Sequence, residues 1–333
     1  MSEGLPKISI IMPVLNREAT IEKAIQSVIQ QNYPKLEFII LDGASTDGTV
    51  SIIKQYERHL AYWHSQPDGS PVRAVNLGIQ KATGDLVVLF MSDDWYEPDI
   101  LARIGKAYQL HPEADMFTCG GQIVRFDAQS GLYVPTVVYD SRKRMALNLQ
   151  NICLDVTSAI CCRFIRRTLY EKIGDYWCLA PDGKYMLSND KEFLIRAVLY
   201  GAKDVYVDYV GHHYLASPLS STFGKHQKNI LRLCVEHRQL IDVYLQKETL
   251  SVRQRYFFHY WYLDQSVRLF LFELLAGQFK AAVIEALKGV KRYGPVWPAI
   301  FPVIVLKIIG KKCWRASHRL YACSRLLCPV EIK

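Results

Sequence analysis

The N-terminal third of the chain alternates between short apolar runs and longer stretches with the periodicity of an amphipathic helix. The apolar runs span Lys7–Met12, Leu36–Leu41, Leu60–Ser65 and Asp85–Met91. The helical patterns span Ala19–Gln31, Thr49–Arg58, Val72–Ala82 and Asp99–Leu110. Strands that alternate with helices pair in parallel, and the helices cover both faces of the sheet. The pattern therefore predicts an α/β fold with a mostly parallel sheet flanked by helices.

The pattern changes in the next hundred residues, which we expect to complete the same domain, 1–222, as its second half, 116–222. Met116 to about Asp140 shows β-like runs separated by turns, and 163–174 reads as a strand end leading into a short helix. Asn189–Tyr200 predicts an amphipathic helix with Asp190 in its first turn. A further strand at Asp204–Asp208 is expected to close the core.

Residues 223–333 are predicted to form a helical C-terminal extension. Its segment Pro295–Gly310 is apolar but contains three prolines and Lys307, and it falls short of the ~20 residues that a membrane-spanning helix needs. Basic residues flank the segment, so we expect 293–333 to lie on an anionic membrane surface, with Trp297, Phe301, Ile304 and Ile308 inserted. The alternative is a helix packed on the protein with a solvated basic face.

The formal charge of +9 belongs to this C-terminal segment. From Lys280 to Lys333 there are eleven Lys and Arg against Glu285 and Glu331, a balance of +9, so the rest of the chain is neutral overall. A nucleic-acid-binding protein would spread its basic residues over the main folded face. We therefore expect no nucleic-acid partner.

The cysteines indicate neither a disulfide framework nor a zinc site. There are nine, an odd number at irregular spacing; Cys161 and Cys162 are adjacent, and no CxxC occurs. The N-terminal sequence MSEGLPKISIIMPV has no basic region followed by a long apolar stretch, so it does not read as a signal peptide. We expect a cytoplasmic protein that is peripheral on the cytoplasmic face of the membrane.

Two acidic motifs follow predicted strands. Asp93 and Asp94 come directly after the fourth apolar run, where adjacent carboxylates repel each other unless a divalent cation relieves the repulsion. Oxygen ligands of this kind suit Mg2+ or Mn2+, although a solvated turn beside a helix cap is an alternative. Asp42 ends the second run and begins a loop rich in Gly, Ser and Thr, which could simply cap the next helix.

Taken together, these segments resemble the family-2 inverting glycosyltransferases with the GT-A fold. The likeness is carried by PVLNREATIEKAIQSVIQQNYPKLEFIILDGASTDGT, AVNLGIQKATGDLVVLFMSDDWYEPDIL, FIRRTLYEKIGDYW and SNDKEFLIRA, and it covers about residues 7 to 215. It implies a Rossmann-like GT-A domain in which 1–115 binds a nucleotide-sugar donor and 116–222 forms the acceptor side. The implied reaction moves a sugar to an acceptor hydroxyl, in polysaccharide or glycolipid biosynthesis.

The resemblance also implies the roles of individual residues. Pro13 and Asn16 would lie beside the nucleotide, and Asp42 would bind its base or ribose. Asp93 would contact the donor, and Asp94 would be the direct ligand of Mg2+ or Mn2+.

Toward the C-terminus of the domain, Asp190 matches the general base of the family. His212 and His213 follow the last predicted strand, where some GT-A enzymes use a late histidine; we assign His213 to the metal, with a structural histidine as the alternative.

Three positions depart from the family pattern. Met91 replaces a frequent Asp or Asn, Asn189 replaces the usual Glu before the base, and Arg73 could place a cation near the donor. These departures affect donor identity and leave the reaction type standing.

Two other functions fit part of the pattern. A transferase acting on a polyisoprenyl phosphate would explain the basic tail, but its anionic acceptor needs less help from a base such as Asp190. A non-catalytic sugar-binding scaffold would not need Asp42, Asp93, Asp94 and Asp190 together. The expected acceptor is a glycan or a lipid-linked glycan.

Overall fold

The computed structural model describes residues 4–154, 159–216 and 226–306. The chain divides into two compact units, 1–225 and 226–333. The domain boundary expected from the sequence, between 222 and 223, lies outside the described residues.

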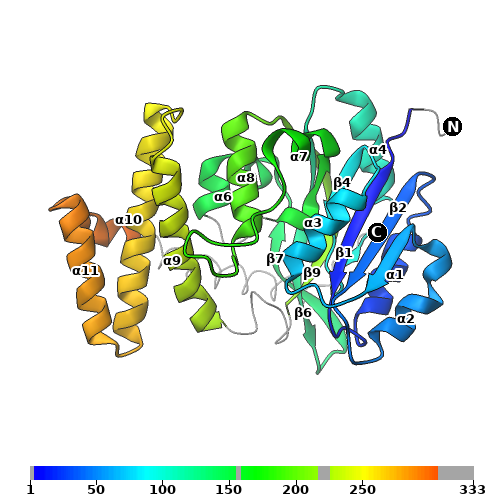
Figure 1. Ribbon diagram of the computed structural model, residues 1–333, viewed down its shortest axis with the longest axis horizontal. Helices are drawn as coiled ribbons and strands as arrows, with labels where there is room; N and C mark the ends of the chain where they lie inside the picture. Colours follow the sequence, from blue (N-terminus) through cyan, green and yellow to red (C-terminus); the bar gives the residue numbers. More distant parts are fainter. Residues whose placement is uncertain (1–3, 155–158, 217–225, 307–333) are drawn as a thin grey trace, which may run out of the picture. The chain divides into compact units, whose positions relative to one another are not determined.

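The first half of the N-terminal unit is a parallel sheet, as predicted (Figure 1). Its strands are β1 (Ile8–Val14), β2 (Leu36–Asp42), β3 (Tyr62–Ser65) and β4 (Leu86–Leu89), in the order β3-β2-β1-β4. The helices between them are α1 (Ile21–Ile29), α2 (Thr49–Gln55) and α3 (Pro71–Lys81), and η1 (Glu57–His59) is a single 3₁₀ turn. Helix α4 (Ile100–Leu110) follows the short strand β5 (Trp95–Tyr96).

Successive side chains of the buried strands point to opposite faces of this sheet. Ile10 and Met12 of β1 belong to the core that also contains residues of α1 and α4. Ile11 points to the opposite face, where a Cβ on Gly78 of α3 would meet its Cγ2 atom at 2.4 Å. A glycine at position 78 therefore lets α3 lie directly on the sheet.

The second half of the unit turns the sheet into a mixed one. Its strands are β6 (Met116–Asp127), β7 (Leu132–Tyr139), β8 (Arg163–Arg166) and β9 (Asp204–Leu215). Strand β8 pairs antiparallel with both β4 and β6, whereas β9 runs parallel to β6. The helical elements are α5 (Arg142–Met145), α6 (Leu149–Leu154), η2 (Ile160–Cys162), α7 (Arg167–Ile173) and α8 (Asn189–Tyr200). The mostly parallel arrangement is thus a property of the first half.

Strand β9 is longer than predicted. The expected strand ended at Asp208, but β9 continues to Leu215 because it pairs with β6 and, near its end, with β5. His212 and His213 therefore lie within the strand and not after it. A strand places successive side chains on opposite faces, so the two imidazoles point in different directions.

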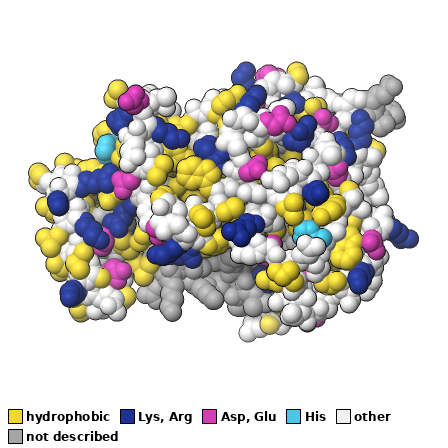
Figure 2. Space-filling view, in the orientation of Figure 1, with side chains coloured by type: hydrophobic (Ala, Val, Ile, Leu, Met, Phe, Trp, Pro, Cys, Tyr) yellow, Lys and Arg dark blue, Asp and Glu magenta, His cyan; other side chains and the backbone are white. Residues whose placement is uncertain are grey.

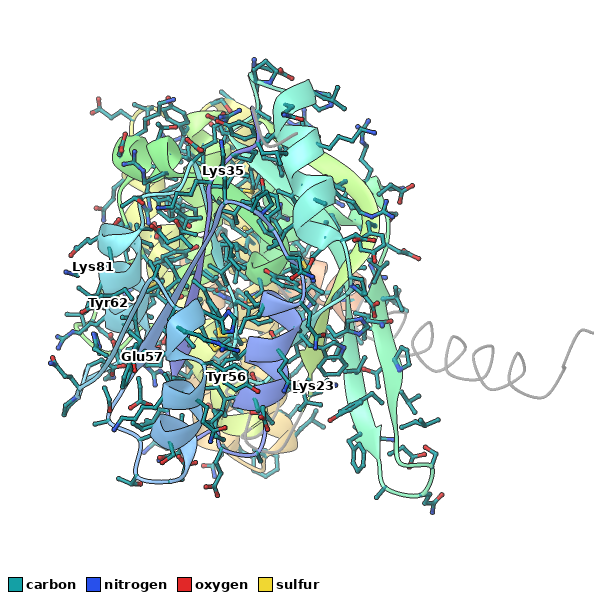
Figure 3. All side chains as sticks on the ribbon, turned by 90° about the vertical axis from the view of Figure 1, so that its right-hand side faces the viewer. Lys23, Lys35, Tyr56, Glu57, Tyr62 and Lys81 are labelled. Carbon is teal, nitrogen blue, oxygen red and sulfur yellow. The ribbon has the colours of Figure 1, made fainter. Side chains whose placement is uncertain are left out.

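A hairpin of β6 and β7 projects from the same unit (Figure 3). Lys23 of α1 points toward it, and its Nζ lies 3.1 Å from the ring centroid of Trp95 and 3.8 Å from that of Tyr133 in β7. Burial lowers the pKa of Lys23. Lys23 therefore connects α1 to Trp95 of β5 and to Tyr133, which lies beside the turn of the hairpin, by cation–π contacts.

The second unit is helical, as predicted. It contains α9 (His226–Leu245), α10 (Val252–Leu275), α11 (Phe279–Tyr293) and helical residues 296–306. Leu263, Val267, Trp297 and Ile304 form its described hydrophobic cluster. No helix within residues 4–154, 159–216 and 226–306 is both long and apolar enough to cross a membrane.

Trp297 and Ile304 were expected to insert into a membrane, and this expectation is wrong. Their exposed fractions are 5% and 0%, and the Trp297 indole donates a 3.0 Å hydrogen bond to Ser266 of α10. Gly289 of α11 makes this packing possible, because a Cβ there would meet the indole nitrogen at 2.1 Å. The packed-helix alternative describes these residues; Ile308 lies outside the described ones.

Candidate active site

A cavity of about 580 Å³ opens at the carboxyl ends of β1 and β4. This edge is where open α/β sheets bind ligands. Its lining, drawn from both halves of the unit, includes Pro13, Asn16, Arg17, Asp68, Met91, Asp93, Gln122, Tyr139, Cys161, Asp190, His212 and Tyr214. The volume is sufficient for a small-molecule ligand.

Asn16 joins the end of β1 to the loop after β2. Its φ of 52° is left-handed, a conformation that asparagine tolerates better than most residues. Its side-chain oxygen accepts a 2.9 Å hydrogen bond from the backbone amide of Thr46. The backbone amide of Asn16 donates a 2.8 Å hydrogen bond to the Ser45 hydroxyl. Pro13 and Asn16 thus lie on the cavity wall, where the sequence predicted a nucleotide contact.

Asp42 holds the same loop through buried hydrogen bonds. It is fully buried and accepts hydrogen bonds from the Ser45 amide at 2.9 Å and from the hydroxyls of Ser45 and Ser65 at 2.5 and 2.6 Å. It is not among the described residues that line the cavity. Its contact with a base or ribose therefore stays a prediction.

The turn after β4 separates the two adjacent carboxylates. Asp93 faces the cavity, and burial together with the charge of Asp94 raises the pKa of Asp93 to about 6, although Arg17 acts in the opposite direction. Asp94 turns inward and is 1% exposed. The turn is fixed by the Thr20 hydroxyl, which donates to the Ser92 carbonyl at 3.0 Å.

His212 is the direct partner of Asp94. Its Nε2 lies 3.0 Å from Asp94 Oδ2, and the Leu215 amide donates to Asp94 Oδ1 at 3.2 Å. Burial disfavours the charged imidazolium, but the Asp94 carboxylate outweighs burial and raises the pKa of His212 to about 10. Without a cation, a protonated His212 therefore balances the charge of Asp94.

His213, which the sequence assigned to the metal, lies on the other face of β9. Its Nε2 is 2.5 Å from Glu97 Oε1, its Nδ1 is 2.8 Å from the Gln122 amide nitrogen, and its ring stacks on Trp95. Its role as a metal ligand stays a prediction, while the structure brings His212 to Asp94.

Cys161 completes a group with Asp94 and His212. One ligand atom from each of the three buried residues lies within 4.8 Å of the other two. Burial raises the pKa of the Cys161 thiol well above its usual range, and the neighbouring carboxylate of Asp94 adds to the effect. The thiol lies on the cavity wall.

Asp190 also lines the cavity, at the start of α8 as predicted. Its Oδ1 accepts a 2.7 Å hydrogen bond from the Lys191 amide. The helix is held by Arg196, which forms an ion pair with the fully buried Glu192 and donates to the carbonyls of Gly174 and Asp175 at 2.9 and 2.7 Å. This anchoring fixes the position of the Asp190 carboxylate.

Comparison with known proteins identifies this arrangement. Residues 9–174 match the model of the family described as Glycosyl transferase family 2. An uncharacterized glycosyltransferase of Mycobacterium tuberculosis (strain H37Rv) is 30% identical over 198 residues, which cover 58% of this chain and 70% of that protein. The chain belongs to glycosyltransferase family 2.

Another relative of this glycosyltransferase carries the name of a biosynthetic enzyme. The putative teichuronic acid biosynthesis glycosyltransferase TuaG of Bacillus subtilis (strain 168) is 34% identical over 108 residues, 31% of this chain and 42% of TuaG. This match spans less than half of TuaG.

Solved structures confirm the GT-A fold of the glycosyltransferase. Staphylococcus aureus TarS 1–349 in complex with UDP-GlcNAc aligns with a TM-score of 0.53 at 15% identity, covering 91% of this chain and 92% of that one. The mannosyltransferase PcManGT of Pyrobaculum calidifontis, in complex with GDP-Man and Mn2+, aligns with a TM-score of 0.54 at 16% identity, covering 91% and 85%. At these identities the likeness concerns the fold.

The residues of the glycosyltransferase fit a divalent cation at Asp94. A cation would replace the proton of His212 as the positive charge beside Asp94, and it would relieve the repulsion by Asp94 that contributes to the raised pKa of Asp93. Asp94 and His212 would hold the cation, with Asp93 facing the cavity beside them. The cation would supply positive charge to a bound diphosphate.

Sequence reasoning about the glycosyltransferase missed two contributors to the site. Arg17 lines the cavity close to Asp93, whereas Arg73, the cation proposed from the sequence, is exposed in the first turn of α3. The position of Arg17, directly after Asn16, was a signal that could have been used. Cys161 carried no such signal, because its partners are distant in sequence.

Proposed function

We propose that this glycosyltransferase transfers a hexosyl group from a nucleotide-diphosphate donor to an acceptor hydroxyl with inversion, assisted by Mg2+ or Mn2+. One observation carries the proposal: Asp190 lines the same cavity as Asp93 and His212, although these residues come from separate elements. A base opposite a diphosphate site is what a single in-line displacement requires.

The proposed chemistry assigns one task to each side of the cavity. Asp190 accepts the proton of the acceptor hydroxyl while that oxygen forms a bond to the anomeric carbon. The bond from that carbon to the diphosphate oxygen breaks on the opposite face, so an α-linked donor gives a β-linked product. Arg17 stabilises the negative charge that develops on the leaving diphosphate. Asp94 and His212 would hold a cation, which would supply further positive charge there.

The donor side of the cavity supports a nucleotide sugar. Pro13 and Asn16 line one end, and Met91 places an apolar side chain where an acidic one was expected from the family pattern. The structural neighbours were solved with UDP-GlcNAc and with GDP-Man and Mn2+. We therefore propose UDP-sugars and GDP-sugars as the first donors to test.

Isothermal titration calorimetry tests the donor assignment. The protein is titrated with UDP-, GDP- and dTDP-sugars in Mn2+ and then in EDTA. The proposal expects at least one donor to bind in Mn2+ and to bind much more weakly in EDTA. Absence of binding to every donor in Mn2+ would contradict it.

For the acceptor, we propose a glycan or lipid-linked glycan at the cytoplasmic face of a membrane. A carboxylate at Asp190 is useful for an acceptor that must lose a proton, which favours a hydroxyl over a polyisoprenyl phosphate. The same carboxylate argues against a non-catalytic scaffold. Membrane attachment would bring the enzyme to a lipid-linked acceptor.

Helix α11 supports the membrane part of this proposal. Phe279, Val283, Leu287 and Val290 are 66%, 56%, 64% and 44% exposed, and at roughly 100° per residue they fall within one narrow stripe of the helix. The exposed Lys280 and Lys291 border this stripe. Figure 2 shows apolar and basic side chains intermixed on the visible surface of the helical unit. An apolar stripe with a basic rim suits an anionic lipid surface.

Vesicle sedimentation tests this attachment. Phe279→Ser combined with Leu287→Ser should release the protein from vesicles of mixed anionic and zwitterionic lipid. Val252→Ser, at an 88% exposed position of α10, is the control and should leave binding unchanged. Equal binding of all three proteins would contradict attachment through α11.

A further inference from the structure

The Sγ atom of Cys161 belongs to the same ligand group as the Asp94 carboxylate and the His212 imidazole. The three residues come from the turn after β4, from η2 and from β9. Their exposed fractions are 1%, 7% and 3% for Asp94, Cys161 and His212. A thiol, an imidazole and a carboxylate are therefore held together, out of bulk water, at the wall of the donor cavity.

We propose that Cys161 is a ligand of the divalent cation at this site, so that the site prefers a thiophilic ion such as Zn2+ or Co2+ to Mg2+. The inference rests on the proposed function, which places a cation at Asp94. Thiolates favour zinc, whereas Mg2+ favours oxygen ligands alone. The S, N, O donor set leaves a fourth position of a tetrahedral shell for a donor phosphate oxygen or a water.

The spacing of the three ligand atoms suits such a shell after a small adjustment. In a tetrahedral site with bonds of about 2.0–2.3 Å, ligand atoms lie roughly 3.3–3.8 Å apart. The 3.0 Å separation of His212 Nε2 and Asp94 Oδ2 and the upper limit of 4.8 Å for the group bracket this range.

The thiol of the neighbouring Cys162 lies outside the ligand group of Asp94, Cys161 and His212. It is hydrogen-bonded to Cys119 and to His212, and a Cβ at Gly121 would meet its sulfur at 2.7 Å. Cys162 thus supports the His212 ring from behind, as outer partners of metal-binding histidines do. On binding of the cation, the Cys161 thiol and the imidazolium each release a proton to solvent, and Sγ and Nε2 donate their electron pairs to the cation.

Titration of the full-length protein with Co2+ tests the inference by absorption spectroscopy. A cobalt–thiolate bond gives a charge-transfer band in the near ultraviolet, whereas cobalt bound by any ligand set gives weaker ligand-field bands in the visible. The wild type should show both. Cys161→Ser should lose the charge-transfer band and keep the visible bands. Cys178→Ser, at a partly exposed thiol outside the group, should keep both.

The outcomes separate this inference from the proposed function. Visible bands without a charge-transfer band in the wild type would overturn the role of Cys161 and leave the cation site standing. A visible spectrum identical to that of free Co2+ would contradict the cation site itself. A charge-transfer band that survives Cys161→Ser and disappears in Cys162→Ser would also overturn the assignment.

A competition measurement tests the inference if the variant Cys161→Ser folds poorly. Cys161→Ala replaces Cys161→Ser, and circular dichroism shows which variant is folded. Zinc affinity, measured against a chromophoric chelator in excess Mg2+, should fall at least about tenfold relative to the wild type, by analogy with losses at metal-supporting residues. An unchanged zinc affinity in the folded variant would overturn the inference.

Discussion

His212 Nε2 lies 3.0 Å from Asp94 Oδ2, although the two residues are separated by 118 positions in the sequence. The contact exists because β9 pairs at His212 and His213 with β5, the short strand that directly follows Asp94. It joins the acidic turn of the donor half to the last strand of the second half. The site is therefore assembled only when both halves of the unit are folded.

Asp94→Asn should weaken Mn2+-dependent donor binding at least about tenfold, because a neutral amide is a poorer ligand for a hard cation. The fold should persist, since an amide oxygen can still accept from the Leu215 amide. Calorimetry with the donor in Mn2+ measures the effect. Asp99→Asn, at an exposed position between β5 and α4, is the control. Wild-type affinity in Asp94→Asn would argue against the cation site.

Arg196→Ala should lower the free energy of unfolding by about 3–5 kcal/mol, because it leaves the fully buried Glu192 carboxylate without its ion-pair partner. Urea denaturation measures the change. Arg167→Ala breaks the exposed Arg167–Glu171 pair and should cost less than about 1 kcal/mol. Equal effects of the two substitutions would show that Arg196 does not anchor α8.

Glu37 should give the fold a pH-dependent contribution. Burial opposes its charged form, but hydrogen bonds from Lys7, Ser9 and Thr83 prevail and lower the pKa of Glu37 to about 2. A lowered pKa stabilises the fold above the unfolded pKa of about 4.3, and the stabilisation is lost as the pH falls toward 2.

The difference in free energy of unfolding between the wild type and Glu37→Gln should therefore be roughly 2–3 kcal/mol near pH 7. It should shrink between about pH 5 and pH 3. Urea denaturation across this range measures it, with the exposed Glu171→Gln as the control. A difference that stays constant with pH would mean that the charge of Glu37 is not responsible.

The sequence predicted the elements with strong local signals. Helix α8 begins at Asn189 and ends at Tyr200 as expected, because its apolar positions recur at helical spacing. Asp190 could therefore be placed at the start of that helix, while its role in the active site was implied by the family resemblance. The acidic turn at Asp93 and Asp94 was predicted for the same reason, since an apolar strand directly precedes it.

Elements defined by distant pairing were not predictable. The stretch after Asp208 contains Gly211 and two histidines and has no clear strand pattern, yet β6 recruits it into β9. Gly211 also permits close packing, because a Cβ there would meet Ile100 at 2.6 Å. The choice between His212 and His213, and the position of Cys161, both depend on this pairing.

The apolar C-terminal segment shows a second limit of prediction from the sequence. Its hydrophobicity was clear from the sequence, but hydrophobicity alone does not distinguish lipid from protein as the covering partner. Trp297 and Ile304 pack within the helical unit. Exposed apolar side chains lie on α11 and also on the segment itself, at Val296, Val303 and Leu306.

The most direct test of the central claim compares nucleotide diphosphate release by the wild type and Asp190→Asn, with a bound donor, Mn2+ and a panel of glycan acceptors. The wild type should release the diphosphate with at least one acceptor. Asp190→Asn should bind the donor with wild-type affinity and turn over ~10² to 10⁴ times more slowly, because an amide cannot accept the proton. Asp182→Asn, at an exposed position, should behave as the wild type. Turnover by Asp190→Asn at the wild-type rate would contradict the claim that Asp190 is the base.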